Sequence, residues 1–325
     1  MDERRTLTVT QAGTLLPFLL EAVRDKSRNT VKGLLSRRQV LVDGRAVTRF
    51  DHPLSPGQTV TLLPRSAAGA WELPFPVLYE DAALLAVDKP AGLLSMGSDR
   101  EKKRTAYRLA SDYVKAREPG KRLFIVHRLD RDTSGVLLFA KDEGLKRRLQ
   151  ENWDRLVTRR AYVAVVEGAP PREEGEVRSF LRETGTHLVY SGAPGRDARE
   201  AVTRYRVLAR SRGFSLVEVE LDTGRKNQIR VHMKDLGCPV AGDRQYGAQS
   251  DPMGRLGLHA HALALTDPRS RRPLVLQAPW PEPFRRMVPG QGEQKAPEEL
   301  RGLTKRGKTA IIKMGRALRQ AVSPV

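Results

Sequence analysis

The chain has 325 residues, enough for two domains or for one large core with an appendage. Its formal net charge of +20 is spread along the whole sequence, which indicates a polyanionic partner. No apolar run approaches the ~20 residues that a membrane-spanning helix needs, and the N-terminus lacks the apolar core of a signal peptide. The single cysteine, Cys238, excludes an internal disulfide and a cysteine-based zinc cluster. We therefore expect a cytoplasmic protein without a membrane partner.

The first part of the chain is predicted to form two short helices and a small sheet. Apolar residues recur at helical spacing over residues 15–23 and 31–35. Residues 40–47, VLVDGRAV, place an Asp-Gly turn between two apolar runs, which is a strong hairpin signal. The polar side of the second helix carries four cations: Arg28, Lys32, Arg37 and Arg38.

The order of these elements, with Ser27, Arg28 and residues 40–44, resembles the S4 RNA-binding domain. The resemblance implies a small α/β domain over residues 1–63 whose helix cations bind RNA. The alternative is that these cations only solvate a helix face. Residues 64–75, rich in Ala, Gly and Pro, are predicted to be a linker.

Residues 76–289 alternate irregularly between predicted strands and helices, without the glycine pattern of a dinucleotide site or a P-loop. This favours an α+β domain with a mixed, largely antiparallel sheet flanked by helices and loops. The most informative segment is 127–135, HRLDRDTSG, between the predicted buried strands 123–126 and 136–140. It sets Asp130 in a turn at a strand end, as in an active-site loop.

Two families place an aspartate in such a segment. Residues 127–135 resemble in full the signature of the RluA-type pseudouridine synthases, His-Arg-Leu-Asp followed two residues later by Thr-Ser-Gly. This resemblance implies an isomerase that converts uridine to pseudouridine in RNA without a cofactor, with Asp130 as its catalytic residue. A shorter match to the haloacid-dehalogenase-type phosphohydrolases would instead place Asp130 and Asp132 on Mg²⁺. The third possibility is a surface turn in which Asp132 is a local cap.

Two later segments resemble further blocks of the synthase catalytic domain. Residues 159–168, RRAYVAVVEG, alternate like a strand, and the resemblance implies that Tyr162 stacks on the target uracil. Residues 221–233, LDTGRKNQIRVHM, resemble the block whose arginine, here Arg230, pairs with the catalytic carboxylate of Asp130. From the residues alone, the tyrosine could be a core residue of a sheet and the arginine could bind a phosphate.

The second of these segments departs from the family at one position. Asn227 stands where the synthases usually have His. Asn is a good helix N-cap, so we expect a helix from Gln228 to Leu236, ended by Gly237. The departure removes any hydrogen bond that the imidazole would make.

Three shorter segments match synthase blocks in the same order: 84–93, 242–247 and 258–263. His259 and His261 face the same way on a predicted strand, but no Cys, Asp or Glu nearby in the sequence completes a recognisable ligand set. We therefore expect no metal and no other cofactor. The phosphohydrolase alternative needs a downstream acidic site, for which Asp243 and Asp251 are the candidates.

A target uridine must leave its helix or folded loop before its glycosidic bond can be reached. By resemblance, Arg128 fills the gap left in the RNA and Tyr162 holds the uracil, while Asp130 acts as a nucleophile or as a base. Ribosomal RNA is the predicted substrate and transfer RNA the alternative; a non-catalytic RNA-binding or ribosome-assembly factor is the hypothesis from a different class. We expect a monomer. Residues 290–325 are predicted to be a basic tail that is either disordered or forms an amphipathic helix on RNA over residues 309–318.

Overall fold

The computed structural model describes residues 4–36, 39–63, 73–97, 101, 104–118 and 120–287. Arg37, Arg38, most of the predicted linker and the predicted tail lie outside these residues. The chain divides into two compact units, Met1–Pro74 with Asp99–Leu123, and Phe75–Ser98 with Phe124–Val325. None of the described helices is long and apolar enough to cross a membrane.

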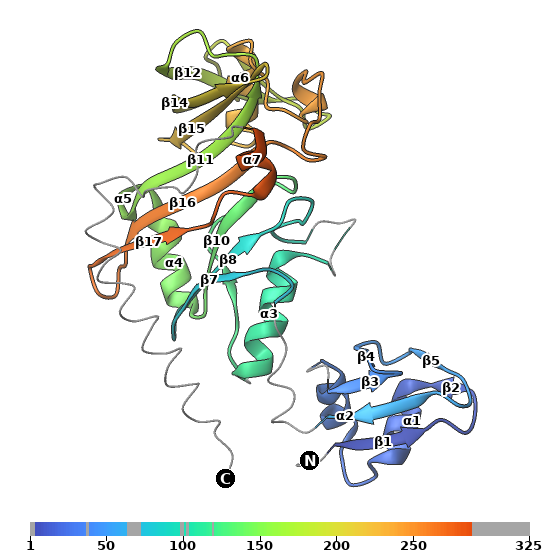
Figure 1. The fold of residues 1–325 in the computed structure, drawn as a ribbon. Coiled ribbons are helices and arrows are strands. Elements are labelled where there is room, and N and C mark those ends of the chain that lie inside the picture. Colours follow the sequence, from blue (N-terminus) through green and yellow to red (C-terminus); the bar gives the residue numbers. More distant parts are fainter. Residues whose placement is uncertain are drawn as a thin grey trace, which may run out of the picture. The chain divides into compact units, whose positions relative to one another are not determined.

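The smaller unit holds an antiparallel sheet in the order β1-β6-β3-β4 and a second sheet of β2 and β5 (Figure 1). Its elements are β1 (Arg5–Thr8), β2 (Gly13–Thr14), α1 (Leu15–Ala22), α2 (Arg28–Ser36), β3 (Val40–Val42), β4 (Arg45–Ala46), β5 (Pro53–Leu54), β6 (Thr59–Leu62) and α3 (Ala106–Arg117). Leu19 of α1, Leu35 of α2 and Val60 of β6 share one buried core. The two predicted helices and the predicted hairpin are confirmed.

The hairpin between β3 and β4 turns at its Asp-Gly pair. Asp43 and Gly44 both have a positive φ, +48° and +77°, as tight two-residue hairpins require. The Asp43 carboxylate also accepts hydrogen bonds from the Thr59 N–H and the Gln58 side chain, both at 2.8 Å. These bonds hold the turn against the start of β6.

The larger unit is built on one extended sheet in the order β13-β12-β14-β15-β11-β16-β10-β8-β7, with β17 beside β16 and β9 beside β10 (Figure 1). Its strands are β7 (Val77–Glu80), β8 (Leu84–Lys89), β9 (Phe124–Ile125), β10 (Ser134–Ala140), β11 (Val157–Glu167), β12 (Glu174–Glu183), β13 (Val189–Gly192), β14 (Arg199–Ser211), β15 (Phe214–Leu221), β16 (Leu258–Thr266) and β17 (Pro273–Gln277). Its helices are α4 (Glu143–Glu151), α5 (Trp153–Leu156), α6 (Gln228–Asp235), α7 (Glu282–Met287) and the 3₁₀ turn η2 (Arg244–Tyr246). The strands pair antiparallel except β10 with β16. The predicted mixed, largely antiparallel sheet is confirmed.

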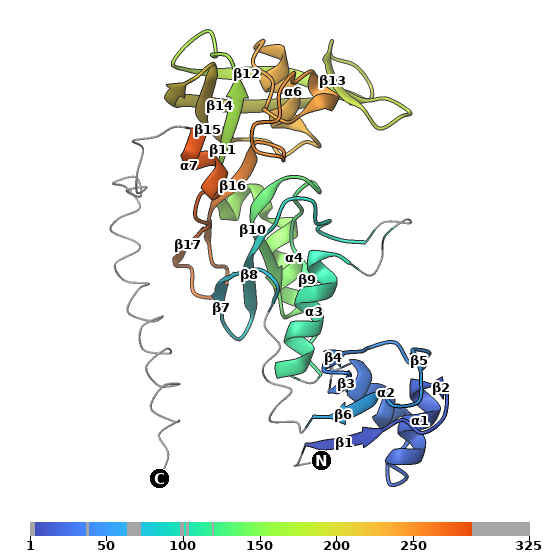
Figure 2. The same ribbon diagram turned by 45° about the vertical axis from the view of Figure 1, so that its right-hand side comes forward.

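Different helices cover the two halves of this sheet. On the half with β8 and β10, Leu145 and Leu149 of α4 pack against Leu138. All residues of β10 are buried, which explains its uninterrupted apolar run. On the other half, Ile229 and Met233 of α6 pack against β15, and Figure 2 shows α6 beside β13.

The two halves of the sheet meet at a short parallel contact between β10 and β16. Two residue pairs form it, Ser134 with His259 and Gly135 with Ala260. Gly135 has a φ of +113°, and a Cβ atom placed on it would lie 2.1 Å from the Ala260 carbonyl oxygen. A side chain at position 135 would push the two strands apart, so the contact requires glycine.

Gly135→Ala should lower the free energy of unfolding by about 3 kcal/mol or more, because steric overlap and the left-handed backbone both disfavour a side chain. Gly168→Ala is the matched control. Gly168 also has a positive φ, +69°, but nothing lies within 4 Å of its Cβ position. This control should lose only about 1 kcal/mol. Urea unfolding followed by tryptophan fluorescence measures both losses, and equal losses would contradict the close approach of β10 and β16.

Candidate active site

Asp130 lies in the loop between β9 and β10, and both of its neighbours in the chain are held in place. The Ser95 hydroxyl donates to the Leu129 carbonyl (2.6 Å), and the Leu129 N–H donates to the Ser95 oxygen (3.0 Å). The Lys89 ammonium donates to the Arg131 carbonyl (3.0 Å). The backbone on either side of Asp130 is therefore fixed before any substrate binds.

Lys89 is fully buried at the end of β8. Its ammonium also donates to the carbonyls of Pro90 (2.9 Å) and Leu93 (2.7 Å). Burial lowers the pKa of Lys89 to about 8, although the negative charges of Asp132 and Asp130 act in the opposite direction. This role was not predicted from the sequence. Its signal was a lysine that ends an apolar strand, directly after Asp88.

Side chains of the signature segment fix the two ends of the aspartate loop. His127 Nε2 accepts a hydrogen bond from the Leu138 N–H (3.1 Å), and burial lowers the pKa of His127 to about 4, so the imidazole is neutral. The Ser134 oxygen lies 2.7 Å from His259 Nδ1 and accepts from the Arg255 guanidinium at 2.6 Å. The signature therefore shapes the loop as well as supplying Asp130.

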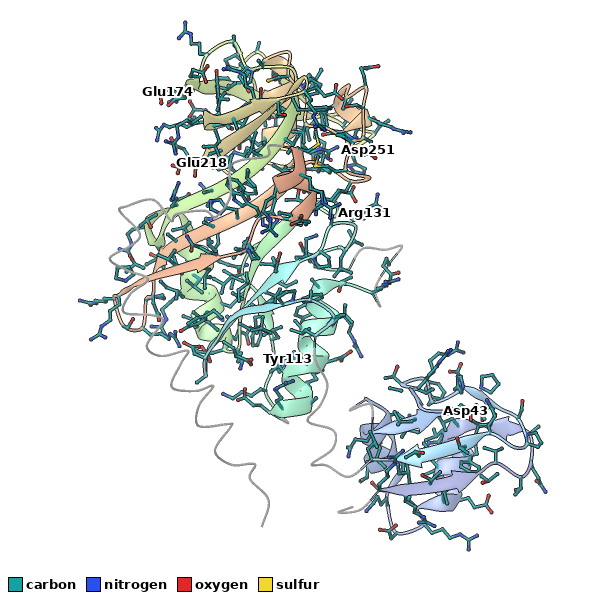
Figure 3. The ribbon with its side chains drawn as sticks, in the orientation of Figure 1. Asp43, Tyr113, Arg131, Glu174, Glu218 and Asp251 are labelled. Atoms are coloured by element: carbon teal, nitrogen blue, oxygen red, sulfur yellow. The ribbon has the colours of Figure 1, made fainter. Side chains whose placement is uncertain are left out.

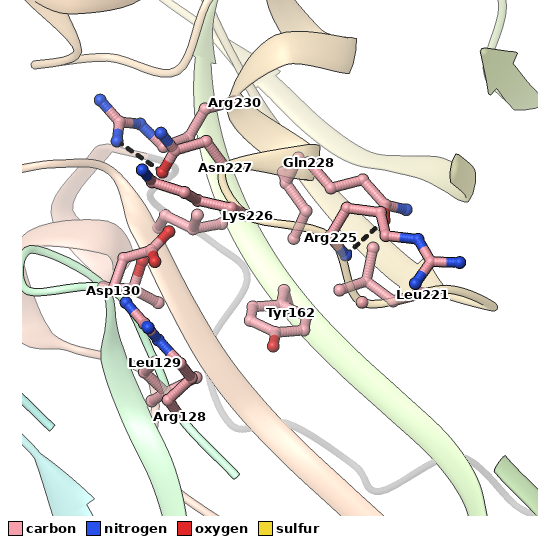
Figure 4. Close-up of a pocket in the computed structure, with 14 residues that line it drawn as sticks. Arg128, Leu129, Asp130, Tyr162, Leu221, Arg225, Lys226, Asn227, Gln228 and Arg230 are labelled. Carbon is pink, nitrogen blue, oxygen red and sulfur yellow. Dashed lines mark hydrogen bonds between the residues drawn. The ribbon is translucent and has the colours of Figure 1, made fainter. Parts of the chain in front are cut away.

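One cavity of about 200 Å³ is lined by Arg128, Asp130, Tyr162 and Arg230 (Figure 4). The structure thus brings these four predicted residues together from the aspartate loop, β11 and α6. Burial raises the pKa of Tyr162 to about 12, although Arg160 acts in the opposite direction. The phenol is therefore uncharged and presents a neutral aromatic surface to the cavity.

The predicted ion pair between Arg230 and Asp130 is wrong, because Arg230 pairs with Asp243. Its Nε and Nη2 atoms donate to the two carboxylate oxygens of Asp243 at 2.6 and 2.7 Å. The Asp243 side chain is 1% exposed, so its charge is removed from water and needs a two-point partner. Burial lowers the pKa of Arg230, but hydrogen bonds to Asp243 and the nearby charge of Asp130 more than offset this and raise it.

The Asp130 carboxylate itself makes no hydrogen bond or ion pair within the described part of the chain. Its electrostatic partners, Lys89 and Arg230, act on it from a distance. Both carboxylate oxygens are therefore available to a substrate in the cavity.

The predicted N-cap role of Asn227 is also wrong. Asn227 has a left-handed backbone, with φ of +54°, and its side chain makes no capping bond. Its Nδ2 donates to the Tyr246 hydroxyl (3.1 Å), and its Oδ1 accepts from Arg230 Nη1 at 3.0 Å, drawn as a dashed line in Figure 4. Both polar atoms of the Asn227 amide are therefore used in contacts with Tyr246 and Arg230. The helix itself is confirmed as α6, and Gly237 follows it with a positive φ, +77°.

Besides Arg230, three cations line the cavity: Arg128, Arg225 and Lys226. Arg225 donates to the Glu200 carbonyl, and Lys226 donates to the Glu183 carboxylate. Arg128 has no hydrogen bond or ion pair among the residues that the structure describes. Its guanidinium can therefore bind an external ligand without first leaving a partner.

Arginines on β11 and β14 are balanced by acidic residues. Glu218 of β15, labelled in Figure 3, accepts from Arg159 (3.0 Å) and Arg206 (2.9 Å). Arg204 of β14 pairs with Asp222 at 2.7 Å. Positive charge is neutralised on this part of the sheet, in contrast to the cavity edge at Arg128.

On the smaller unit, Arg28 and Lys32 are exposed on α2, and Lys32 Nζ lies 5.8 Å from the Phe50 ring centroid. The other two predicted RNA-binding cations, Arg37 and Arg38, lie outside the described residues.

Over the described ranges, no three His, Cys, Asp or Glu side chains gather as metal ligands. The acidic residues that a phosphohydrolase would need are engaged in protein contacts. Asp243 is paired with Arg230, and Asp251 accepts a hydrogen bond from the Arg255 N–H at 2.9 Å.

Comparison with known proteins agrees with this geometry. A family model for RNA pseudouridylate synthase matches residues 83–235. An uncharacterised RNA pseudouridine synthase of Bacillus subtilis is 33% identical over 284 residues, which cover 83% of this chain and 91% of that protein. A ribosomal large subunit pseudouridine synthase D of Xanthomonas campestris is 34% identical over 298 residues, 86% of this chain and 88% of that protein. The solved structure of human RNA pseudouridylate synthase domain containing 4 superposes with a TM-score of 0.54 and 26% identity, covering 64% of this chain and 89% of that one.

The family match includes the aspartate loop, β11 and α6, which are the three elements that line the cavity. Because this match contains Asp130 and Asp132, it excludes the phosphohydrolase alternative. The chain therefore belongs to the RNA pseudouridine synthase family, isomerases that convert uridine to pseudouridine in RNA.

Proposed function

We propose that this chain isomerises specific uridines of ribosomal RNA in the cavity around Asp130. The proposal is supported above all by the Asp130 carboxylate, which shares one cavity with Tyr162 and Arg128. Within the described ranges, the side chains of Asp130 and Arg128 have no hydrogen-bond or ion-pair partner. Relatives from Xanthomonas campestris and Nitrosomonas europaea are named as ribosomal large subunit pseudouridine synthase D, and the net charge of +20 suits a large polyanion. Transfer RNA is the alternative substrate.

The reaction needs no external atom. The bond between uracil N1 and ribose C1′ breaks, the uracil turns, and C5 forms the new bond to C1′. The hydrogen on C5 leaves as a proton, and N1 gains one. Asp130 acts on the ribose as a nucleophile or on the uracil as a base, and both roles require the ionised carboxylate.

The cavity residues would also hold the extruded nucleotide. Extrusion costs a few kcal/mol, and stacking on an aromatic face offsets part of this cost. Tyr162 offers an uncharged aromatic face in the cavity, beside Asp130. We assign Arg128 to the space that the nucleotide leaves in the RNA.

The smaller unit would supply a second contact with RNA. We propose that residues 1–63 of this unit form the S4-like domain expected from the sequence, and that Arg28 and Lys32 on the exposed side of α2 bind phosphates. The order of helices, hairpin and sheet supports this assignment. We further propose that the enzyme acts as a monomer and without a cofactor.

Asp130→Asn should lower turnover by about 1000-fold or more, because the substitution removes the ionised carboxylate. RNA affinity should change by less than about 3-fold, since the amide has the same shape and position. Ribosomal RNA with tritium at uracil C5 provides the assay, with EDTA present, because isomerisation must release that hydrogen.

Wild-type release with an inactive Asp130→Asn variant would establish the site. Tritium release from transfer RNA but not from ribosomal RNA would identify transfer RNA as the substrate. Tight binding without release from either RNA would favour a non-catalytic binding factor.

Arg128→Ala should slow isomerisation of a uridine in structured RNA by about 10-fold, because part of the extrusion cost is no longer offset. A short unstructured oligonucleotide with the same target should lose much less. Arg147→Ala is the matched control, since Arg147 is an exposed arginine of α4 that does not line the cavity. Equal slowing on both RNAs would argue against a role in extrusion.

Arg28→Gln with Lys32→Gln should reduce the slope of log affinity against log salt by about 1.4, because each single-strand phosphate contact contributes about 0.7. The double variant Arg147→Gln with Arg212→Gln makes the same change in net charge on exposed residues of the larger unit. If the two double variants change the slope equally, net charge rather than the cations of α2 determines the salt dependence of binding.

A further inference from the structure

Arg230 is held in the cavity wall by a loop that follows α6 in sequence. The side chains of Arg230 and Asp243 are 14% and 1% exposed, so their two-point ion pair is shielded from water. Gln245 accepts a further hydrogen bond from Arg230 Nη2 at 3.0 Å. A shielded, two-point pair fixes both the position and the plane of a guanidinium.

Tyr246 supports the same guanidinium from another side. Arg230 Cζ lies 4.6 Å from the Tyr246 ring centroid, and Tyr246 is 3% exposed. The Tyr246 hydroxyl accepts hydrogen bonds from Asn227 Nδ2 (3.1 Å) and from the Val189 N–H (3.2 Å). The ring is therefore tied to β13 and to the start of α6.

The Asn227 side chain bridges the Arg230 guanidinium and the Tyr246 hydroxyl by hydrogen bonds. Arginine can only donate hydrogen bonds, so the amide oxygen must face Arg230 and the amide nitrogen must face Tyr246. Both amide groups are used, and Asn227 is almost fully buried. The amide carries no titratable proton in the physiological range.

We propose that Asp243, Asn227 and Tyr246 are positioning residues that hold Arg230 beside Asp130, and that the amide at position 227 makes this arrangement insensitive to pH. This inference rests on the proposed role of Asp130 in uridine isomerisation. It assigns a function to the segment 242–247 and to the one position at which this chain departs from the usual His of its family.

A histidine at position 227 would behave differently as the pH changes. Neutral imidazole can accept from Arg230 with one nitrogen and donate to the Tyr246 hydroxyl with the other. Imidazolium has two donors and a positive charge, so protonation would repel the guanidinium. Arg230 would then lose this hydrogen bond and shift relative to Asp130, while still paired with Asp243.

Other charged or titratable groups also surround Arg230. They are Arg128, Asp130 and Asp132 from the aspartate loop, Arg225 and Lys226 before α6, Asp243, Tyr246 and Arg255 from the segment after α6, and Glu183 with His187, which contact Lys226 from β12 and the turn after it. These groups are the same in the wild type and in Asn227→His. A comparison of the two proteins at each pH therefore isolates position 227.

Asp243→Asn should lower the single-turnover rate of tritium release by about 10- to 100-fold, because small displacements of a positioned group reduce rates by such factors. RNA affinity should stay close to wild type, whereas Tm should fall because the buried Arg230 charge loses its counter-ion. Asp251→Asn is the matched control in the same loop, with an expected change below about 2-fold. An unchanged rate in Asp243→Asn, or a loss of RNA affinity as large as the loss of rate, would overturn the positioning role.

Asn227→His should match wild type at pH 8 and fall progressively below it towards pH 5.5. The expected ratio of the two single-turnover rates drops by about 5-fold or more over this range, as the imidazole gains its proton. Tyr246→Phe should reduce the rate at every pH. A ratio that stays constant with pH would overturn the role of the amide.

A readout that does not need activity separates this inference from the proposed function. In protein labelled with ¹⁵N-arginine, the Arg230 Nε–H signal, assigned by its loss in Arg230→Lys, should be protected from exchange and unchanged between pH 5.5 and 8. It should shift with pH in Asn227→His. If the wild type shows this protected, pH-independent signal but does not isomerise uridine, only the proposed function is refuted. Rapid exchange of the Arg230 Nε–H signal in wild type would refute the positioning role of Asp243, Asn227 and Tyr246.

Discussion

The site depends on the short parallel contact between β10 and β16. On one side of this contact lies the aspartate loop, and on the other lie β11, with Tyr162, and α6, with Arg230. Two residue pairs join the halves, and Gly135 has no room for a side chain there. The Ser134 hydroxyl adds bonds to His259 and Arg255 at the same junction. Ser134 and Gly135 of the signature thus serve the packing of the two strands, whereas Asp130 supplies the chemistry.

Buried charges surround the aspartate loop, and each is costly unless it is fully bonded. Lys89 meets this condition with three carbonyl acceptors, and Arg230 meets it with Asp243, Asn227 and Gln245. Such groups contribute little net stability, because the cost of desolvation offsets the attraction. Their effect is to fix geometry and to place positive potential near Asp130.

The pairing of Arg230 with Asp243 has a consequence for the catalytic carboxylate. A carboxylate that was held by a two-point ion pair would have its oxygens occupied and would have to break that pair to act. In this chain Asp243 pairs with the guanidinium, and Asp130 lines the cavity without an ion-pair partner among the described residues. Arg230 still acts on Asp130 through its charge, without competing with a substrate for it.

The sequence by itself determined the local structure. Alternation and apolar runs predicted the strands, the Asp-Gly pair predicted the hairpin of the smaller unit, and residues 228–237 predicted α6 with its terminal glycine. It also identified Asp130, Tyr162, Arg128 and Arg230 through a family resemblance, and the structure gathers these four in one cavity. Local patterns suffice for such features because they depend on residues a few positions apart.

Only the tertiary structure decided which partners these residues have. The ion pair of Arg230 spans 13 positions, the Lys89 bond to Arg131 spans 42, and the Ser134 contact with His259 spans 125. Sequence periodicity carries no information on such distances. The local rule for Asn227 as a helix cap failed for the same reason. A distant hydroxyl and a guanidinium compete for the same amide, and in a buried site every polar group must be satisfied.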